Sequence, residues 1–140
     1  MARRRRRTQD PPPQRLILDA GAVIALSRED PRARAVLASA REARIQVSIP
    51  SVVVAETVRG VATDAPVNRI VKAVGEVSLA DERVGRTAGR LLGEAGSDST
   101  IDALVVASAI DAGGAVILTG DPEDLSALSG DRPGVVIQAL

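Results

Sequence analysis

The sequence predicts an α/β fold in which a parallel sheet is covered by helices. Short apolar runs rich in Val, Ile and Leu alternate with longer segments whose apolar residues recur at helical spacing. Strands that are apolar along their whole length are typical of parallel sheets, because helices bury both of their faces. A chain of 140 residues with 45% hydrophobic content is sufficient for one domain with a single core.

Five short strands are expected, at 16–19, 45–49, 76–79, 115–119 and 135–138. Helices are expected between them, at 21–28, 31–43, 51–62, 66–74, 81–95 and 100–112, with a further helical turn at 122–128. Gly113 and Gly114 follow the sixth helix, where glycine commonly ends a helix and lets the chain turn back into the next strand.

The first 14 residues are expected to form a flexible arm, and residues 15–140 the folded domain. The arm contains the basic run Arg3 to Arg7 and then three prolines, so it has no apolar surface to bury and should end in an extended spacer. Because the basic run lies in the arm, residues 8–140 contain 13 basic and 18 acidic residues. An acidic body is unusual for a protein that binds nucleic acid without a metal ion.

Several classes of protein are excluded by composition. The chain contains no Cys and no His, which excludes disulfides, thiolate nucleophiles, sulfur or imidazole zinc sites and triads with a histidine base. It contains no Phe, Tyr or Trp, so contact with nucleic acid would be mostly ionic. No apolar stretch approaches the length of a membrane helix and no signal peptide is recognisable. We therefore expect a cytoplasmic protein with no membrane association.

Four acidic residues stand at corresponding places in this pattern. Asp19 ends the first expected strand, Glu56 lies in the helix after the second, Asp102 opens the sixth helix, and Asp121 follows the fourth strand. In an open parallel sheet the turns after the strands gather at the carboxyl edge, where such folds bind their ligands. The four carboxylates are therefore expected to face one another.

Each acid also has an ordinary structural interpretation. Asp19 and Asp121 stand where a helix N-cap is expected, and Asp102 lies in a segment that resembles a capping box. Glu56 could pair with Arg59, three residues later on the same helix. Taken singly these interpretations are favoured, but four caps have no reason to converge on one edge of the sheet.

Together the four acids predict a metal site. Clustered carboxylates repel one another unless a cation neutralises them, and oxygen ligands select hard ions such as Mg²⁺ or Mn²⁺. Such an ion makes a nucleophile from water and stabilises charge on a phosphate, so phosphodiester hydrolysis needs no histidine. Asp121 or Glu56 would accept the proton from the attacking water.

Three segments resemble the PIN-domain family, and within it the VapC-type toxins. LILDAGAVIAL is similar to the family's first strand and first acid, IPSVVVAETVRG to its second acid on a helix, and STIDALVVASAIDAGGAVILTGDPEDL to its third and fourth acids. The resemblance extends from Leu16 to Gln138. It implies a PIN-like three-layer sandwich, with a central five-stranded parallel sheet and helices on both faces.

The resemblance also implies an activity and partners. The expected function is a Mg²⁺- or Mn²⁺-dependent endoribonuclease that hydrolyses RNA, acts as the toxin of a type II toxin-antitoxin pair, forms a homodimer and is inhibited by a cognate antitoxin. The family's metal-binding acids match Asp19, Glu56, Asp102 and Asp121, and a frequent additional acid matches Asp124. Thr119 and Arg59 are expected to contact the substrate. The family often has hydroxyl or amide residues directly after the first acid, where this chain has Ala20 and Gly21.

Two questions stay open in the sequence. The Arg3 to Arg7 run could contact RNA or operator DNA, or it could be a solubilising tail. Arg59 could hold a phosphate or orient Glu56, or it could form a surface ion pair.

The sequence lacks residues that two other α/β families require. A haloacid dehalogenase would need a second Asp where Gly21 stands, and a receiver domain would need a late lysine, whereas the only lysine is Lys72. The alternative that remains is a catalytically inactive PIN-like module that binds RNA or a partner.

Overall fold

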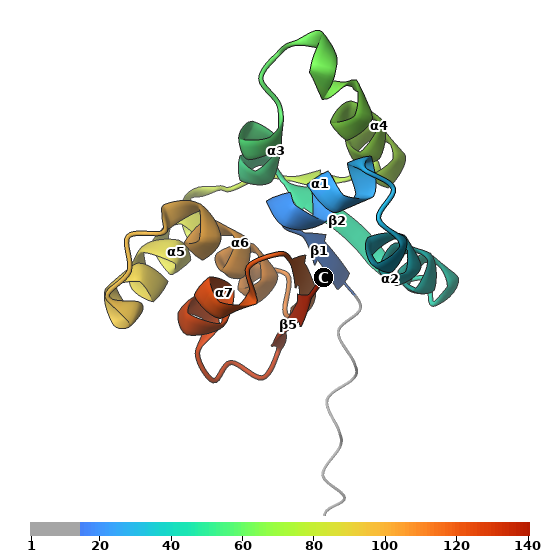
Figure 1. Cartoon of the computed structure of the whole chain (residues 1–140). Coiled ribbons are helices and arrows are strands. Elements are labelled where there is room, and N and C mark those ends of the chain that lie inside the picture. The colour runs from blue at the N-terminus through green and yellow to red at the C-terminus, as the bar shows by residue number, and fades with distance from the viewer. Residues whose placement is uncertain (1–14) are drawn as a thin grey trace, which may run out of the picture.

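The computed structural model describes residues 15–140, so the predicted arm at 1–14 lies outside the described residues. Five strands form one parallel sheet in the order β3-β2-β1-β4-β5 (Figure 1). Their bounds are β1 Arg15–Leu18, β2 Gln46–Pro50, β3 Val77–Ser78, β4 Ala115–Thr119 and β5 Val135–Ala139. All five predicted strands are present, each within two residues of its expected bounds.

Seven α-helices and one 3-10 turn connect the strands of the described chain. They are α1 Ala20–Ser27, α2 Pro31–Glu42, α3 Ser51–Thr57, η1 Ala62–Asp64, α4 Ala65–Val74, α5 Glu82–Ala95, α6 Thr100–Asp111 and α7 Pro122–Ser129. Within residues 15–140, no helix is long and apolar enough to cross a membrane.

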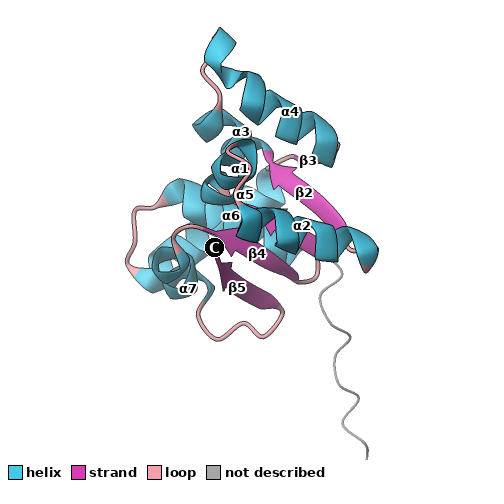
Figure 2. Ribbon diagram, turned by 45° about the vertical axis from the view of Figure 1, so that its right-hand side comes forward, coloured by secondary structure: helices cyan, strands magenta, loops and turns pink. Residues whose placement is uncertain are grey.

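The molecule is a three-layer sandwich. α1, α2 and α4 lie on one face of the sheet, and α5, α6 and α7 lie on the other (Figures 1 and 2). The central strands β1 and β4 are buried between these layers, and Ile17, Leu18, Ile117 and Leu118 are at most 2% exposed. The predicted α/β fold, with helices on both faces of a five-stranded parallel sheet, is therefore confirmed.

The strand order decides which turns come together. β1 pairs with β2 on one side and with β4 on the other, in parallel and nearly in register, with Ile17 opposite both Ser48 and Ile117. The carboxyl ends of these three strands consequently lie side by side. Asp19, the start of α3 and the β4–α7 turn all follow from this edge.

One predicted element is wrong. The helix expected over 51–62 ends at Thr57, and Val58 has extended backbone with φ −117° and ψ 150°. The Thr57 hydroxyl donates to the carbonyl of Val53 at 2.9 Å, a side-chain bond to the helix backbone that slightly destabilises a helix. Asp64 then draws the chain into a turn by accepting hydrogen bonds from the backbone of the next three residues after Val58.

Candidate metal centre at the carboxyl edge of the sheet

Asp19 is held rigidly at the end of β1. It is only 6% exposed and occupies the N-cap of α1, where its Oδ1 accepts a hydrogen bond from the backbone N–H of Ala20 at 2.8 Å. Its Oδ2 accepts one from the hydroxyl of Thr119, at the end of β4, also at 2.8 Å. Asp19 therefore does cap a helix, as expected. Its second hydrogen bond, however, comes from the neighbouring strand β4, and this bond orients the carboxylate along the edge of the sheet.

Thr119 connects two of the predicted acids. The residue is fully buried, its hydroxyl donates to Asp19, and the same oxygen accepts a hydrogen bond from the backbone N–H of Asp121 at 2.9 Å. The single O–H donor of Thr119 is therefore already used within the protein, on Asp19. In the structure the residue holds Asp19 and the turn that carries Asp121, and its contact with a substrate stays a prediction.

Gly21 allows the first helix to approach this turn closely. A Cβ atom added at Gly21 would lie 2.8 Å from the backbone nitrogen of Gly120, a distance that real Cβ atoms do not reach. Any side chain at position 21 would push α1 away from the β4–α7 turn. The glycine at position 21, where the family often has a polar residue, thus allows the backbones of α1 and the β4–α7 turn to pack tightly.

The other acids do not act as helix caps. Asp121 occupies the N-cap of α7 but its side chain makes no capping hydrogen bond there. The capping box expected before Asp102 is also absent, since the N-cap of α6 is Ser99 and has no side-chain cap bond. Glu56 forms no ion pair with any residue in 15–140. The ordinary structural interpretation fails for these three acids.

Electrostatic coupling connects the acids to one another. Burial, and then repulsion from four other carboxylates, together raise the pKa of Asp102 to about 6. The four are Asp19, Asp124, Glu56 and Asp121. Burial and then the charge of Asp19 raise the pKa of Glu56, while Arg59 opposes this shift. Repulsion from Asp121 raises the pKa of Asp124. The structure thus brings all five predicted acids within range of mutual repulsion.

The carboxylates converge without forming a finished cage. In the described part of the chain, no three acidic side chains are grouped closely enough to hold a metal ion as they stand. Glu56 and Asp102 line one open pocket of about 320 Å³, together with Ser99 and Thr100 at the start of α6. The donor set fits a hard divalent cation, because every nearby ligand is a carboxylate oxygen and a cation would relieve the repulsion on Asp102. Side-chain rotation would have to bring the oxygens together.

Arg59 lies beyond the end of α3 rather than on it. Its guanidinium donates to the carbonyls of Ala55 and Val58, at 3.1 and 2.8 Å, and makes no ion pair with Glu56. Arg59 therefore neutralises the exposed carbonyls at the C-terminus of α3, while its charge still lowers the pKa of Glu56. The sequence left open whether Arg59 holds a phosphate or orients Glu56, or forms a surface ion pair with Glu56. The ion pair is wrong.

Asp64 is a buried acid that no sequence motif had indicated. This carboxylate is 7% exposed, and its Oδ2 accepts hydrogen bonds from the backbone N–H groups of Arg59, Gly60 and Val61 at 2.9, 2.7 and 3.1 Å. It fixes the turn between α3 and α4, and with it the position of Arg59. The glycine at position 60 and the proline at position 66 were signals of a turn here.

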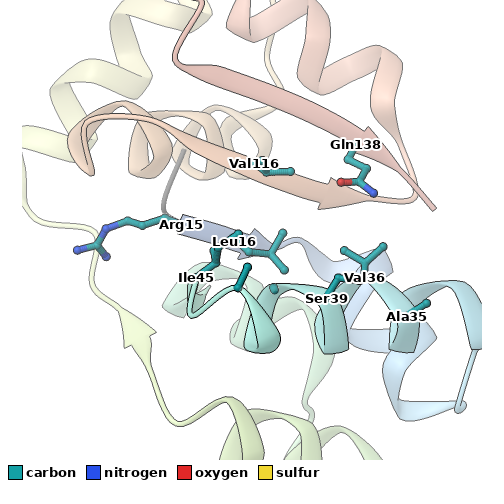
Figure 3. Close-up of a pocket in the computed structure, with 10 residues that line it drawn as sticks. Arg15, Leu16, Ala35, Val36, Ser39, Ile45, Val116 and Gln138 are labelled. Carbon is teal, nitrogen blue, oxygen red and sulfur yellow. The ribbon is translucent and has the colours of Figure 1, made fainter. Parts of the chain in front are cut away.

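A larger pocket lies away from the acids. It has a volume of about 450 Å³ and lies between α2 and the sheet, where Leu16, Val36, Ile45 and Val116 give it an apolar wall (Figure 3). No acidic residue lines it, and Figure 3 shows the guanidinium of Arg15 pointing away from it. This pocket offers no group for acid-base or metal chemistry.

Comparison with known families matches residues 16–130 to the PIN domain. This match covers most of the chain and includes all five acids of the cluster. The chain belongs to the PIN domain family. PIN domains are generally nucleases that use divalent metal ions, which agrees with a carboxylate cluster at this edge. No curated protein sequence matches the chain.

Solved structures share the fold of this PIN domain at low sequence identity. VapBC2 of Rickettsia felis, bound to a DNA fragment from its promoter, has a TM-score of 0.68 and 15% identity, over 90% of this chain and 98% of that one. A toxin-antitoxin complex from Klebsiella pneumoniae has a TM-score of 0.67 and 20% identity, over 86% and 95%. DNA-bound VapBC from Salmonella typhimurium has a TM-score of 0.64 and 18% identity, over 89% and 97%. At these identities the likeness establishes the fold, which is that of VapC-type PIN proteins.

Proposed function

We propose that this PIN domain is a Mg²⁺- or Mn²⁺-dependent endoribonuclease and the toxin of a type II toxin-antitoxin system. The observation that carries the proposal is the environment of Asp102. Its carboxylate is partly buried, receives no capping hydrogen bond and is repelled by four other carboxylates at the same edge of the sheet. Such an arrangement is unfavourable in a merely structural role and useful for holding a cation.

The five acids have different parts in this proposal. Asp19 is the preset ligand, because Thr119 and the backbone of Ala20 fix both of its oxygens. Asp102, Asp121 and Asp124 are the ligands whose repulsion the ion relieves. A bound Mg²⁺ ion supplies a lowered pKa for water and charge stabilisation for a phosphate. The charge of Arg59 reaches Glu56 and lowers its pKa.

Glu56 is the residue we assign to proton transfer. It is exposed at the pocket that it shares with Asp102, so a water molecule and a phosphate can reach it. Burial of its carboxyl group and the charge of Asp19 raise its pKa, which brings it closer to the range of an effective general base at neutral pH. Asp121 is the second candidate, because Thr119 fixes its backbone.

The proposal is tested by incubating the purified protein with total RNA, with and without Mg²⁺, and mapping the cut ends. We expect metal-dependent cleavage, and a loss on the order of 10²-fold or more in Asp19→Asn, which keeps the shape of the side chain but removes its charge. Asp98→Asn is the matched control, since Asp98 is exposed, lies outside the cluster and makes no side-chain hydrogen bond with residues 15–140. Intact RNA with folded wild-type protein would instead favour the inactive RNA- or partner-binding module.

The proposed partners follow from the family rather than from a contact in the described chain. We propose that a small antitoxin inhibits the protein, because the solved structures of similar fold include VapBC and other toxin-antitoxin complexes. We also propose that it is a cytoplasmic homodimer. An antitoxin reading frame beside the gene and light scattering of the purified protein test these two points.

A further inference from the structure

Positive charge in the described chain is concentrated on one side of the molecule. Residues 28–72 contain eight basic and five acidic residues, whereas residues 76–140 contain four basic and eleven acidic residues. The first segment includes α2 and α4 on one face of the sheet, and the second includes α5 and α6 on the other (Figure 1). The domain is therefore polarised, with a basic side that its overall acidity conceals.

Five exposed residues, which we call the α2–α4 basic strip, carry much of this charge: Arg34, Arg41, Arg44, Arg69 and Lys72. Arg41 connects the two helices, because its guanidinium donates to the carbonyl of Ala73 at 3.2 Å, one residue after Lys72. Arg34 lies seven residues before Arg41, on the same side of α2, and Arg69 lies three residues before Lys72. The strip thus continues from one helix to the other.

The charges of this strip are not neutralised within the described domain. All four ion pairs between residues 15–140 use other basic residues, namely Arg15, Arg83, Arg86 and Arg132. An acidic domain offers many carboxylates, and the C-terminal half pairs three of its four basic residues with them. The strip instead directs its charges to solvent, where an external anion can reach them.

Helix stabilisation explains only part of the strip. Arg41 and Lys72 lie in the last turns of their helices, where cations interact well with the helix dipole. Arg34 lies near the N-terminus of α2, where a positive charge opposes the helix dipole, although the N-cap Asp30 four residues earlier supplies a negative charge there. Arg69 lies in the middle of α4 and gains nothing from either end. Helix stabilisation therefore does not account for Arg69, and both charges stay available to a ligand outside the domain.

We propose that the α2–α4 basic strip binds the phosphate backbone of single-stranded RNA, beside the nucleotides that reach the acids. The identity of the polyanion rests on the proposed function. α4 packs on α1, which begins directly after Asp19, and it follows α3, which carries Glu56. The strip therefore flanks the two helices nearest these acids. With no aromatic residue available for base stacking, the chain binds RNA chiefly through such ionic contacts.

The test is the salt dependence of binding to a long fluorescent single-stranded RNA, measured in EDTA so that no cleavage occurs. In the double variant Arg69→Gln/Lys72→Gln, which leaves the Arg41 bond to Ala73 intact, we expect the slope of log K against log salt to fall by about 1.4. Affinity at low salt should fall on the order of tenfold. The control Arg86→Gln/Arg90→Gln removes two exposed charges from α5 and should change neither value.

The outcomes separate this inference from the proposed function. If the strip variant binds RNA with the wild-type slope, or if only a duplex DNA of equal length is bound less well, the inference is overturned and the charges are left for another partner. If the slope falls while the wild-type protein never cleaves RNA, the strip stands and the nuclease proposal fails. In a cleaving enzyme, the strip variant should show a raised KM on long RNA and an unchanged kcat. Its melting temperature should fall only slightly, because Lys72 no longer complements the dipole of α4.

Discussion

Asp64 and Asp102 are two acids in opposite surroundings. Asp64 accepts three backbone hydrogen bonds on one oxygen, and those from Arg59, Val61 and Gly60 lower its pKa. Asp102 has no such donors, and burial together with four neighbouring carboxylates raises its pKa to about 6. The first carboxylate holds a turn together, and the second weakens the fold that contains it.

This difference distinguishes an acid that the fold satisfies from one that a cation would stabilise. A carboxylate that the chain already satisfies has nothing left to offer a ligand, whereas one that is buried and repelled gains from any cation that arrives. Asp19 has both properties. Hydrogen-bond donors fix its carboxylate, and its charge adds to the repulsion at Asp102 and Glu56.

The largest expected effect comes from Asp102→Asn, which removes the repelled charge. Metal-dependent cleavage should fall on the order of 10²- to 10⁴-fold, while the metal-free protein should become more stable because the repulsion is gone. RNA cleavage and thermal melting in EDTA measure the two changes. A fall in melting temperature without metal would contradict the comparison, since it would make Asp102 a structural acid like Asp64.

Thr119→Val would turn Asp19 into a less well held ligand. The valine has a similar shape but cannot donate to Asp19 or accept from the backbone of Asp121. We expect Mn²⁺ affinity, measured by calorimetry, to fall about 10- to 100-fold, as for other residues that orient metal ligands. Thr87→Val on α5, where the threonine makes no side-chain hydrogen bond in the described chain, should bind Mn²⁺ normally. Equal affinities would exclude the orienting role.

The pH dependence of Mn²⁺ affinity and of stability should also distinguish the surroundings of Asp102 from those of Asp64. Protonation of Asp102, whose pKa is about 6, competes with metal, so Mn²⁺ affinity should rise about tenfold between pH 5 and 7.

The stability of the metal-free protein should change in the opposite direction and fall as the pH rises. The folded state holds the proton more tightly than the unfolded state, so this contribution to stability is present below pH 3.8 and lost as the pH rises through about 6. Asp102→Asn should remove both dependences.

The smallest effect on catalysis is expected at Asp64. Asp64→Ala leaves three backbone N–H groups without their acceptor, and the melting temperature should fall on the order of 5 °C. Activity should fall only a few-fold, through a less ordered Arg59, and Mn²⁺ affinity should hardly change. Asp64→Asn keeps an acceptor oxygen and should recover part of the lost stability. A loss of Mn²⁺ binding in Asp64→Ala would place this residue in the metal site instead.

The elements of the fold could be predicted because their signals are local. Apolar runs and helical spacing located every strand and most helix ends within two residues, and a glycine pair correctly placed the return into β4. The exception is the helix expected over 51–62, which ends at Thr57. Its valines fit a helical pattern, and the acceptor that turns the chain away, Asp64, lies seven residues further on.

The candidate site was predictable as a set of residues but not as a set of roles. The positions of Asp19, Glu56, Asp102 and Asp121 after strands implied a common edge. The fully buried state of Thr119, which makes it an orienting residue, depends on packing between β4 and β1 and has no local signature. The same holds for the close approach of Gly21 to Gly120.

The sequence by itself determined the class of fold, the acids that gather at one edge of the sheet, and the absence of any histidine or cysteine chemistry. These properties follow from periodicity and composition, which depend only on the order of the residues and not on their positions in space. Only the tertiary structure decided which acids are satisfied and which repel one another, and that an acidic domain presents a basic strip. Such properties depend on distances between residues far apart in the chain, and folding alone sets those distances.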